Sequence, residues 1–249
     1  MPKPRFIELP DVAPIPILFE DRSVIAIDKP AGWMLVPHSW QRTTWNLQAA
    51  IVSSIAAGHF WARSRNLKFL RYIHRLDAET SGVMLFGKSF GAVETFGGLF
   101  ESRRMQKRYL AVVHGEPRER EWACRLPLGP DPQQIGRIVV DQRAGKDCET
   151  FFRALETKGG FTLVEAHPRT GRQHQLRVHL LASGHAILGD PLYGPSAQEH
   201  PRQRPALALR AVELAYHDPF TKRPVRIVAP TEEWLRGLGF PPAPRQPKV

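Results

Sequence analysis

Asp77 is the residue whose surroundings point most directly to chemistry. It lies in the segment His-Arg-Leu-Asp-Ala-Glu-Thr-Ser-Gly, residues 74–82, between a mostly apolar stretch and the buried-strand pattern of residues 83–86. A carboxylate placed between two apolar runs lies at the wall of a core, and it stays ionised only beside a cation or hydrogen-bond donors. Such a group can act as a nucleophile or a base. Because Asp and Ser also cap helices, the segment alone leaves a structural role open.

Three arginines stand in a second segment, Pro-Arg-Thr-Gly-Arg-Gln-His-Gln-Leu-Arg-Val-His at residues 168–179. A guanidinium from this segment would keep a buried carboxylate ionised and orient it through a two-pronged contact. The alternative for Arg169, Arg172 and Arg177 is a solvated helix face or general phosphate contacts.

A third segment, residues 103–115, places basic residues just before an aromatic one. Tyr109 begins an apolar strand pattern, and its flat ring with a polar tip suits stacking on a nucleobase, although a tyrosine at the start of a strand is more often an ordinary core residue. The preceding basic residues would meet backbone phosphates or form a solvated helix end. They are Arg103, Arg104, Lys107 and Arg108.

A fourth segment is the apolar run 24–28 followed by Lys29-Pro30-Ala31-Gly32. The Pro and Gly predict a turn after a strand. Lys29 at this turn would assist at a pocket or simply occupy the turn.

Together these segments resemble the RluA-type pseudouridine synthases. Residues 74–82 match the family pattern His-Arg-Leu-Asp-x-x-Thr-Ser-Gly at every specified position, and the other segments follow in the family's order over roughly residues 17–230. Residues 184–194 are also similar to the family's Gly-His-Pro-Ile-x-Gly-Asp-x-x-Tyr-Gly. The chain departs from the family at Arg210, usually histidine, and at Ala186, usually proline.

The resemblance implies a pseudouridine synthase fold and roles for particular residues. Asp77 would be the catalytic carboxylate, Arg177 its partner, and Tyr109 the group that packs against the target base. Arg75 would fill the space left by a flipped uridine or hold the RNA beside it. The remaining candidates for RNA contact are His74, Lys29, Arg172, Lys107, Arg103 and Arg104, with hydrogen bonds within a loop as the alternative for His74 and also for His174.

The implied reaction breaks the N1–C1′ bond of uridine, turns the uracil, and joins C5 to C1′. No redox change occurs, so we expect no cofactor. The spacing of His174 and His179 matches no metal-binding pattern, so we expect no metal. The uridine must leave its stack first, because its reacting atoms are inaccessible inside a helix. Attack at C1′, attack at uracil C6 and deprotonation at C2′ all remain open.

Composition favours a polyanionic partner. The 249 residues include 35 Lys plus Arg against 24 Asp plus Glu, a formal net charge of +11, and the sequence pI is about 10.2. We therefore expect structured RNA, rRNA or tRNA, as the partner. Two cysteines without paired spacing, a beginning without an apolar leader, and no long apolar run predict a cytoplasmic protein without membrane spans. We also expect a monomer.

The organisation predicts one α+β catalytic domain at residues 17–240 with a mixed, mostly antiparallel sheet. A proline-rich arm, 1–16, would precede it, leaving no room for an S4 RNA-binding domain, and a flexible tail, 241–249, would follow. Strands are expected at 17–19, 24–28, 83–86, 109–113, 138–140, 151–155, 161–166, 206–209, 212–216 and 225–228. Helices are expected at 46–55, 90–104 and 173–182, with a last one capped by Thr231 and ended by Gly237.

Three rival interpretations were weighed against the sequence. Residues 82–89 fit the Walker A pattern, but four bulky apolar residues favour a straight strand over a phosphate cradle. A glycoside hydrolase needs two facing carboxylates, whereas Asp77 and Glu79 are two residues apart. A non-catalytic RNA-binding protein with the same fold would bind RNA equally well without Asp77.

Overall fold

The computed structural model describes residues 2–9, 12–35, 45–198, 200 and 204–241. Within these residues the strands are β1 (Phe6–Ile7), β2 (Ile15–Glu20), β3 (Val24–Lys29), β4 (Arg71–Tyr72), β5 (Ser81–Gly87), β6 (Gln106–His114), β7 (Glu121–Cys124), β8 (Leu128–Pro130), β9 (Ile138–Val140), β10 (Thr150–Lys158), β11 (Phe161–Pro168), β12 (Leu209–His217) and β13 (Pro224–Val228). The helices are α1 (Leu47–Ala56), α2 (Phe60–Arg63), α3 (Phe90–Glu101), α4 (Gln175–Ala182) and α5 (Glu232–Gly237), with a 3-10 turn at Pro195–Gln198.

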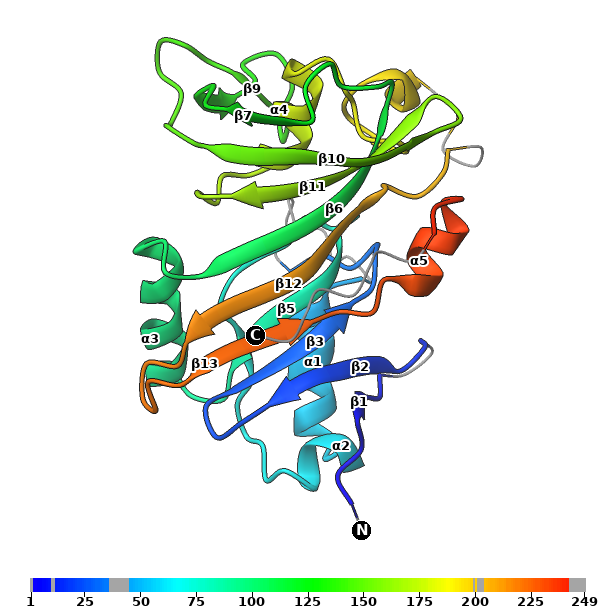
Figure 1. The fold of residues 1–249 in the computed structure, drawn as a ribbon. Helices are drawn as coiled ribbons and strands as arrows, with labels where there is room; N and C mark the ends of the chain where they lie inside the picture. The colour runs from blue at the N-terminus through cyan, green and yellow to red at the C-terminus, as the bar shows by residue number, and fades with distance from the viewer. Residues whose placement is uncertain (1, 10–11, 36–44, 199, 201–203, 242–249) are drawn as a thin grey trace.

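One long twisted sheet organises the described part of the chain (Figure 1). Its order is β1-β2-β3-β5-β12-β6-β11-β10-β7, with β13 beside β12 and β4 beside β5. The pairing of β5 with β12 is parallel, and the other pairs of this sheet in the described residues are antiparallel. The strands β8 and β9 form a separate hairpin. The predicted α+β class with a mixed, mostly antiparallel sheet is confirmed.

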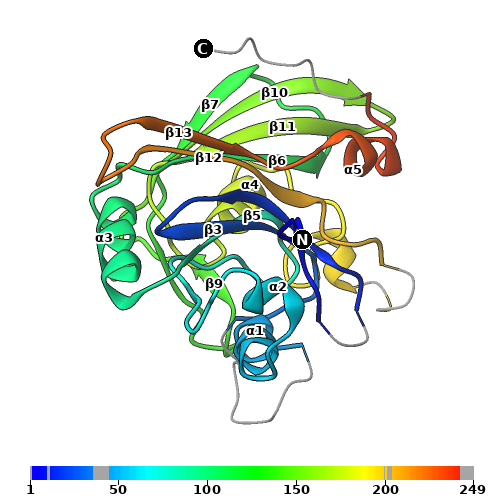
Figure 2. The same cartoon turned by 90° about the horizontal axis from the view of Figure 1, so that it is seen from below.

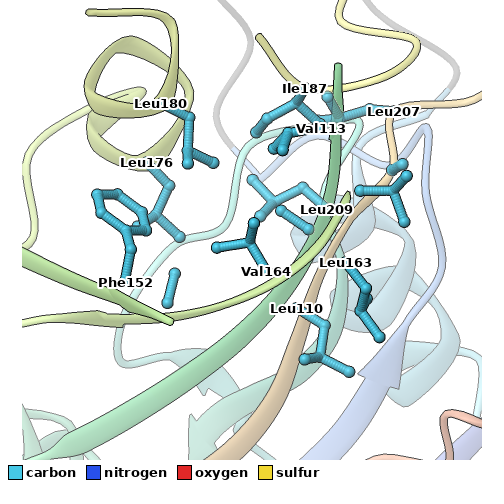
Figure 3. Packing of buried hydrophobic residues seen from close by; sticks show 14 of the residues in the cluster. Leu110, Val113, Phe152, Leu163, Val164, Leu176, Leu180, Ile187, Leu207 and Leu209 are labelled. Atoms are coloured by element: carbon cyan, nitrogen blue, oxygen red, sulfur yellow. The ribbon is translucent and has the colours of Figure 1, made fainter. Parts of the chain in front are cut away.

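Helices pack against both faces of this sheet. α3 clusters with Val24 and Ala26 of β3, whereas α1 and α2 cluster with Ile25 and Ile27, which point to the other face. Figure 2 shows α1, α2 and α4 on the same side of the strands. Leu176 and Leu180 of α4 turn toward Phe152 and Val164 of the sheet, and all four belong to one buried apolar cluster (Figure 3). Burial of this apolar face fixes α4 against β10 and β11.

Helix ends follow local capping. Asn46 accepts a hydrogen bond from the Ala49 N–H at 3.0 Å and begins α1 as expected. The helix predicted at 90–104 is shorter than expected and ends at Glu101. The Ser102 hydroxyl donates to the Gly98 carbonyl at 2.6 Å, and Arg103 takes a left-handed φ of 58°. Arg103 and Arg104 therefore lie beyond the helix.

The N-terminal residues belong to the sheet, which corrects the expectation of an arm before a first strand near Ile17. Phe6 pairs with Pro16 and Ile7 with Ile15. Ile7 and Ile15 are buried in the apolar core. Proline is tolerated in such strands at the border of a sheet because one edge of the strand needs no ladder hydrogen bonds. Most of the predicted tail, residues 242–249, lies outside the described residues.

Other boundaries differ from the expectations for physical reasons. The strand predicted at 206–209 is wrong except for Leu209, where β12 begins and continues through the predicted strand 212–216. The register of β12 shifts between Ala211 and Glu213. The helix expected from Gln173 begins at Gln175, because His174 is left-handed. Thr231 precedes α5 without a side-chain capping bond. The short strands β4, β7 and β8 and helix α2 were not predicted. No helix in the described ranges has the length and apolar character needed to cross a bilayer.

Candidate active site

Lys29, the last residue of β3, anchors the loop that carries Asp77 through hydrogen bonds. Its ammonium donates to the carbonyls of Pro30 at 3.0 Å, Ala78 at 2.9 Å and Thr80 at 2.8 Å. Lys29 is fully buried, so it does not reach RNA as predicted; it ties the β3 turn to the loop. Burial lowers the pKa of Lys29 to about 8, against the raising effect of Glu79 and Asp77.

The end of the loop is placed by Gly82 in β5. The glycine has a φ of 113°, and a Cβ atom there would lie 2.0 Å from the carbonyl oxygen of Ala211 in β12. This close approach accompanies the parallel pairing of Gly82 with Ala211. The glycine that ends the Thr-Ser-Gly segment is therefore required for the contact that seats the loop beside β12.

Asp77 meets Arg177 across the loop, although one hundred residues separate them in sequence. Nη1 of Arg177 lies 3.4 Å from Oδ2 of Asp77 and 3.9 Å from Oε2 of Glu79. The Arg177 side chain is 1% exposed, whereas that of Asp77 is 19% exposed. The carboxylate thus sits at the edge of the core with one face open, as its sequence context predicted.

A second carboxylate, Asp190, holds Arg177 and was not predicted. Nε of Arg177 donates to Oδ2 of Asp190 at 2.8 Å, and Nη2 donates to Oδ1 at 2.7 Å. Burial acts against the charged form of Arg177, but the hydrogen bonds and charge of Asp190, with Asp77 and Glu79, raise its pKa above the ordinary value. Asp190 belongs to the Gly-Asp pair within residues 184–194. The similarity of this segment to the family pattern was the sequence signal that could have indicated Asp190.

Tyr109 comes from β6, where it pairs with Ala166 of β11 and Ala211 of β12. Burial raises the pKa of Tyr109, and the charge of Asp77 raises it further. The phenol is therefore neutral near pH 7 and offers a flat apolar ring with a polar tip.

Asp77, Arg177 and Tyr109 line one cleft of about 540 Å³. This volume falls within the ordinary range of small-molecule sites. Five of the predicted RNA-contact residues share the lining, and they are Arg75, His74, Arg172, Lys107 and Arg103. Lys29 and Arg104 are not among the lining residues.

Two of the predicted RNA contacts are also used within the protein. Nε2 of His74 accepts from the Leu85 N–H at 3.1 Å, and its ring stacks on Phe100 at 4.5 Å. Burial, with the nearby charge of Lys107, lowers the pKa of His74 to about 3, so the ring is neutral. Lys107 donates to the Thr170 carbonyl at 2.7 Å, and burial lowers its pKa to about 8. The hydrogen bond of His74 to Leu85 agrees with the alternative to RNA contact, in which the histidine holds its loop in place.

The arginines before Tyr109 separate into different environments. Arg103 and Arg75 are exposed beside the cleft. Arg104 donates to the Ser102 hydroxyl at 3.0 Å. Arg108 lies between Lys107 and Tyr109 on the strand, so it points to the opposite face. There it pairs with Glu165 at 3.1 Å and Glu213 at 2.9 Å, which corrects its assignment to a phosphate-binding patch.

Arg172 remains at the rim, where it is exposed and lines the cleft. Its Nε donates to the Asp147 carbonyl at 3.2 Å, so the guanidinium is anchored on one side.

His174 and Tyr193 complete the surroundings of Asp77. Nδ1 of His174 lies 2.8 Å from the Tyr193 hydroxyl, and its Nε2 lies 4.0 Å from Oδ2 of Asp77. The Tyr193 hydroxyl accepts from the Ile138 N–H of β9 at 2.9 Å. The Arg177 guanidinium lies 5.1 Å from the centre of the Tyr193 ring. Both residues belong to the segments 168–179 and 184–194, but the approach of His174 to Asp77 was not predicted.

The Walker A alternative is wrong. The apolar residues of its pattern form the buried strand β5, and Lys88 pairs with Glu20 at 2.8 Å. No cradle of inward amides is possible in a strand that is hydrogen-bonded to β3. In the described part of the chain, no group of three or more His, Cys, Asp or Glu residues is placed to hold a metal ion.

Comparison with known proteins identifies the class that this fold and site define. Residues 23–182 match the family described as RNA pseudouridylate synthase. Because the match covers more than half of the chain, the protein belongs to this family.

Individual relatives cover different shares of this chain and of their own lengths. Ribosomal large subunit pseudouridine synthase C of Yersinia pestis is 36% identical over 224 residues, which are 88% of this chain and 67% of that protein. Pseudouridylate synthase RPUSD2 of Mus musculus is 36% identical over 184 residues, which are 74% of this chain but 31% of that protein. This chain therefore spans only a part of these relatives.

A solved structure confirms the fold. Human RNA Pseudouridylate Synthase Domain Containing 1 aligns with a TM-score of 0.68 at 24% identity, covering 87% of this chain and 83% of that one. At this identity the likeness concerns the arrangement of the elements.

Proposed function

We propose that the protein is an RNA pseudouridine synthase that isomerises specific uridines of rRNA or tRNA. The observation that carries this proposal is the placement of Asp77 at an open cleft, 3.4 Å from an arginine that a buried second carboxylate holds in place. Family membership supplies the reaction class.

The target uridine would be flipped out of its RNA and enter the cleft. Tyr109 would pack against the uracil, because a neutral aromatic ring stacks on any base face. Asp77 would then act as nucleophile at C1′ or C6, or as the base at C2′. Each route needs an ionised carboxylate, and the neighbouring guanidinium of Arg177 favours that form.

Exposed arginines at the rim would hold the RNA backbone. Arg75 lies on the same loop as Asp77, so it would occupy the space that the flipped base vacates. Arg103 and Arg172 would contact phosphates on either side. These contacts position the RNA without reading its sequence.

The names of relatives favour ribosomal RNA. The synthase C of Yersinia pestis and the synthase D of Nitrosomonas europaea are both named for the ribosomal large subunit. We infer a large-subunit rRNA uridine as the first target to test, with tRNA as the second.

The deciding experiment compares wild-type protein with Asp77→Asn. Pseudouridine is mapped in RNA from a strain that lacks the gene, after incubation with each protein. The amide keeps the size of the side chain but is neither a nucleophile nor a base. We expect modification at defined uridines by the wild type, at least about a thousandfold less by the variant, in the range of lost catalytic groups, and similar RNA affinity for both.

Two outcomes would contradict the proposal. Product formation by Asp77→Asn at the wild-type rate would remove Asp77 from its role. RNA binding without product by the wild-type protein would favour the non-catalytic alternative.

The compartment and the oligomeric state are further proposals. Cys124 and Cys148 are free and buried, which suits a reducing cytosol. A monomer is expected, and light scattering during gel filtration measures it.

A further inference from the structure

His174 and Tyr193 form a hydrogen-bonded pair beside Asp77 that the proposed mechanism has not used. The Ile138 N–H donates to the Tyr193 hydroxyl oxygen at 2.9 Å. The hydroxyl proton is therefore available for Nδ1 of His174, which lies 2.8 Å away. An imidazole that accepts at Nδ1 carries its proton on Nε2 in the neutral form. This Nε2 lies 4.0 Å from Oδ2 of Asp77.

Burial of the ring favours this neutral form, against the opposing effect of the nearby carboxylates. The groups that face it are Asp77 and Glu79 of the loop, Arg177 of α4, and Asp190 and Tyr193 of the segment after α4. Burial lowers the pKa of His174 below its usual value, Asp77 acts against this, and Arg177 adds to it. The ring is therefore uncharged near pH 7 and still offers one N–H.

Two donors then converge on one oxygen of Asp77. Nη1 of Arg177 lies 3.4 Å from Oδ2, and Nε2 of His174 faces the same atom. Both distances exceed those of good hydrogen bonds, as is common for catalytic contacts before substrate binds. Among the described residues, no side chain donates to Oδ1 at hydrogen-bonding distance.

The backbone of His174 supports a functional constraint. Its φ of 52° and ψ of 17° are left-handed, a conformation that costs a non-glycine residue about 1 kcal/mol or more. This conformation places the buried ring, which is 7% exposed, between Tyr193 and Asp77.

We propose that His174 is a positioning residue for Asp77. Its Nε2–H, with the tautomer set by Tyr193, donates to Oδ2 in the substrate complex and leaves Oδ1 as the oxygen that reacts with the uridine. This inference is based on the proposed pseudouridine synthase activity.

The test compares three variants in single-turnover assays on RNA from a strain lacking the gene. His174→Ala removes the donor, and the rate is expected to fall about 10- to 100-fold, the usual effect of a hydrogen bond to a charged group. RNA affinity should not change. The acidic limb of its rate profile should move to higher pH, because a carboxylate that has lost a donor is protonated more readily.

His174→Gln is the matched control. Its amide oxygen can accept from Tyr193 while its nitrogen donates toward Asp77, and residue 174 keeps the same backbone strain. We expect it to recover most of the rate and the position of the acidic limb. Tyr193→Phe keeps the aromatic ring but removes the hydroxyl that holds the proton of His174 on Nε2. Its rate should therefore fall severalfold at unchanged RNA affinity.

Several outcomes would overturn this inference. One is His174→Ala at the wild-type rate; another is His174→Gln as slow as His174→Ala with no shift of the acidic limb. If His174→Ala does not fold, an unchanged rate for Tyr193→Phe has the same meaning. Wild-type protein and Asp77→Asn are measured alongside, since an inactive wild type would contradict the proposed function itself.

Discussion

At the scale of single residues, the orientation of Asp77 depends on Arg177, and the orientation of Arg177 depends on Asp190. Asp190 is fully buried, and it also accepts from the backbone N–H groups of Leu192 and Tyr193. It therefore fixes one edge of the Arg177 guanidinium. The remaining nitrogen, Nη1, is left to meet Asp77. Orientation of the candidate catalytic carboxylate thus depends on a residue that does not line the cleft.

Asp190→Asn is expected to destabilise the protein and slow turnover. The variant leaves the buried guanidinium of Arg177 without its paired charge, a change that costs about 3 kcal/mol or more. The free energy of unfolding in urea measures the first effect, and the single-turnover rate, expected to fall at least about tenfold, measures the second.

Glu149→Gln is the control for that variant. It breaks the exposed ion pair with Arg125, which should change the unfolding free energy by less than about 1 kcal/mol. Equal effects of the two substitutions would show that Asp190 has no special role.

At the scale of elements, the loop that carries Asp77 is positioned by the junction of β5 and β12. Lys29 holds one side of the loop through three carbonyls, and Gly82 allows β12 to approach on the other. Because β12 also pairs with β6, this junction connects Asp77 to the strand that carries Tyr109. The three catalytic candidates therefore come from elements that are joined within one sheet or packed on it.

Gly82→Ala should disrupt this junction. The added methyl would overlap the Ala211 carbonyl, and the φ of 113° is unfavourable for alanine. We expect a loss of about 3 kcal/mol or more of unfolding free energy from overpacking and backbone strain together, measured by thermal and urea denaturation.

Gly97→Ala in α3 makes the same chemical change where nothing lies within 4 Å of the new methyl. It should be neutral or stabilising by up to about 1 kcal/mol. A Gly82→Ala protein as stable as this control would show that the strands can separate without cost.

At the scale of the whole molecule, the basic residues behind the net charge of +11 differ in their surroundings. Arg108, Arg65 and Lys88 are paired with glutamates, whereas Arg75, Arg103 and Arg172 are exposed beside the cleft. The structure therefore places three exposed guanidinium groups at the entrance to the site.

RNA affinity should fall steeply with added salt, because each phosphate contact releases counterions. Arg103→Gln and Arg172→Gln should each reduce the slope of log Kd against log salt by about 0.7 to 0.9. Filter binding at several salt concentrations measures it. Arg236→Gln in α5, which does not line the cleft, should leave the slope unchanged. A flat salt response of the wild-type protein would argue against phosphate-dominated binding.

Local sequence determined much of this protein. Alternating and continuous apolar runs predicted most strands, Asn46 and the Ser183-Gly184 pair marked true helix ends, and the segment around Asp77 indicated a carboxylate at the wall of a core. These features depend on backbone preferences and side-chain periodicity, which neighbours in sequence control.

Only the tertiary structure decided which charges meet. Arg108 and Lys107 are adjacent in sequence, yet strand alternation and sheet order send one to Glu165 and the other to the cleft. Strand order and helix docking likewise decided three other features. They are the burial of Lys29, the hydrogen bonds of Asp190 to Arg177, and the approach of His174 to Asp77. Contacts between segments far apart in sequence depend on register and packing, because no local pattern specifies which partner fills a buried position.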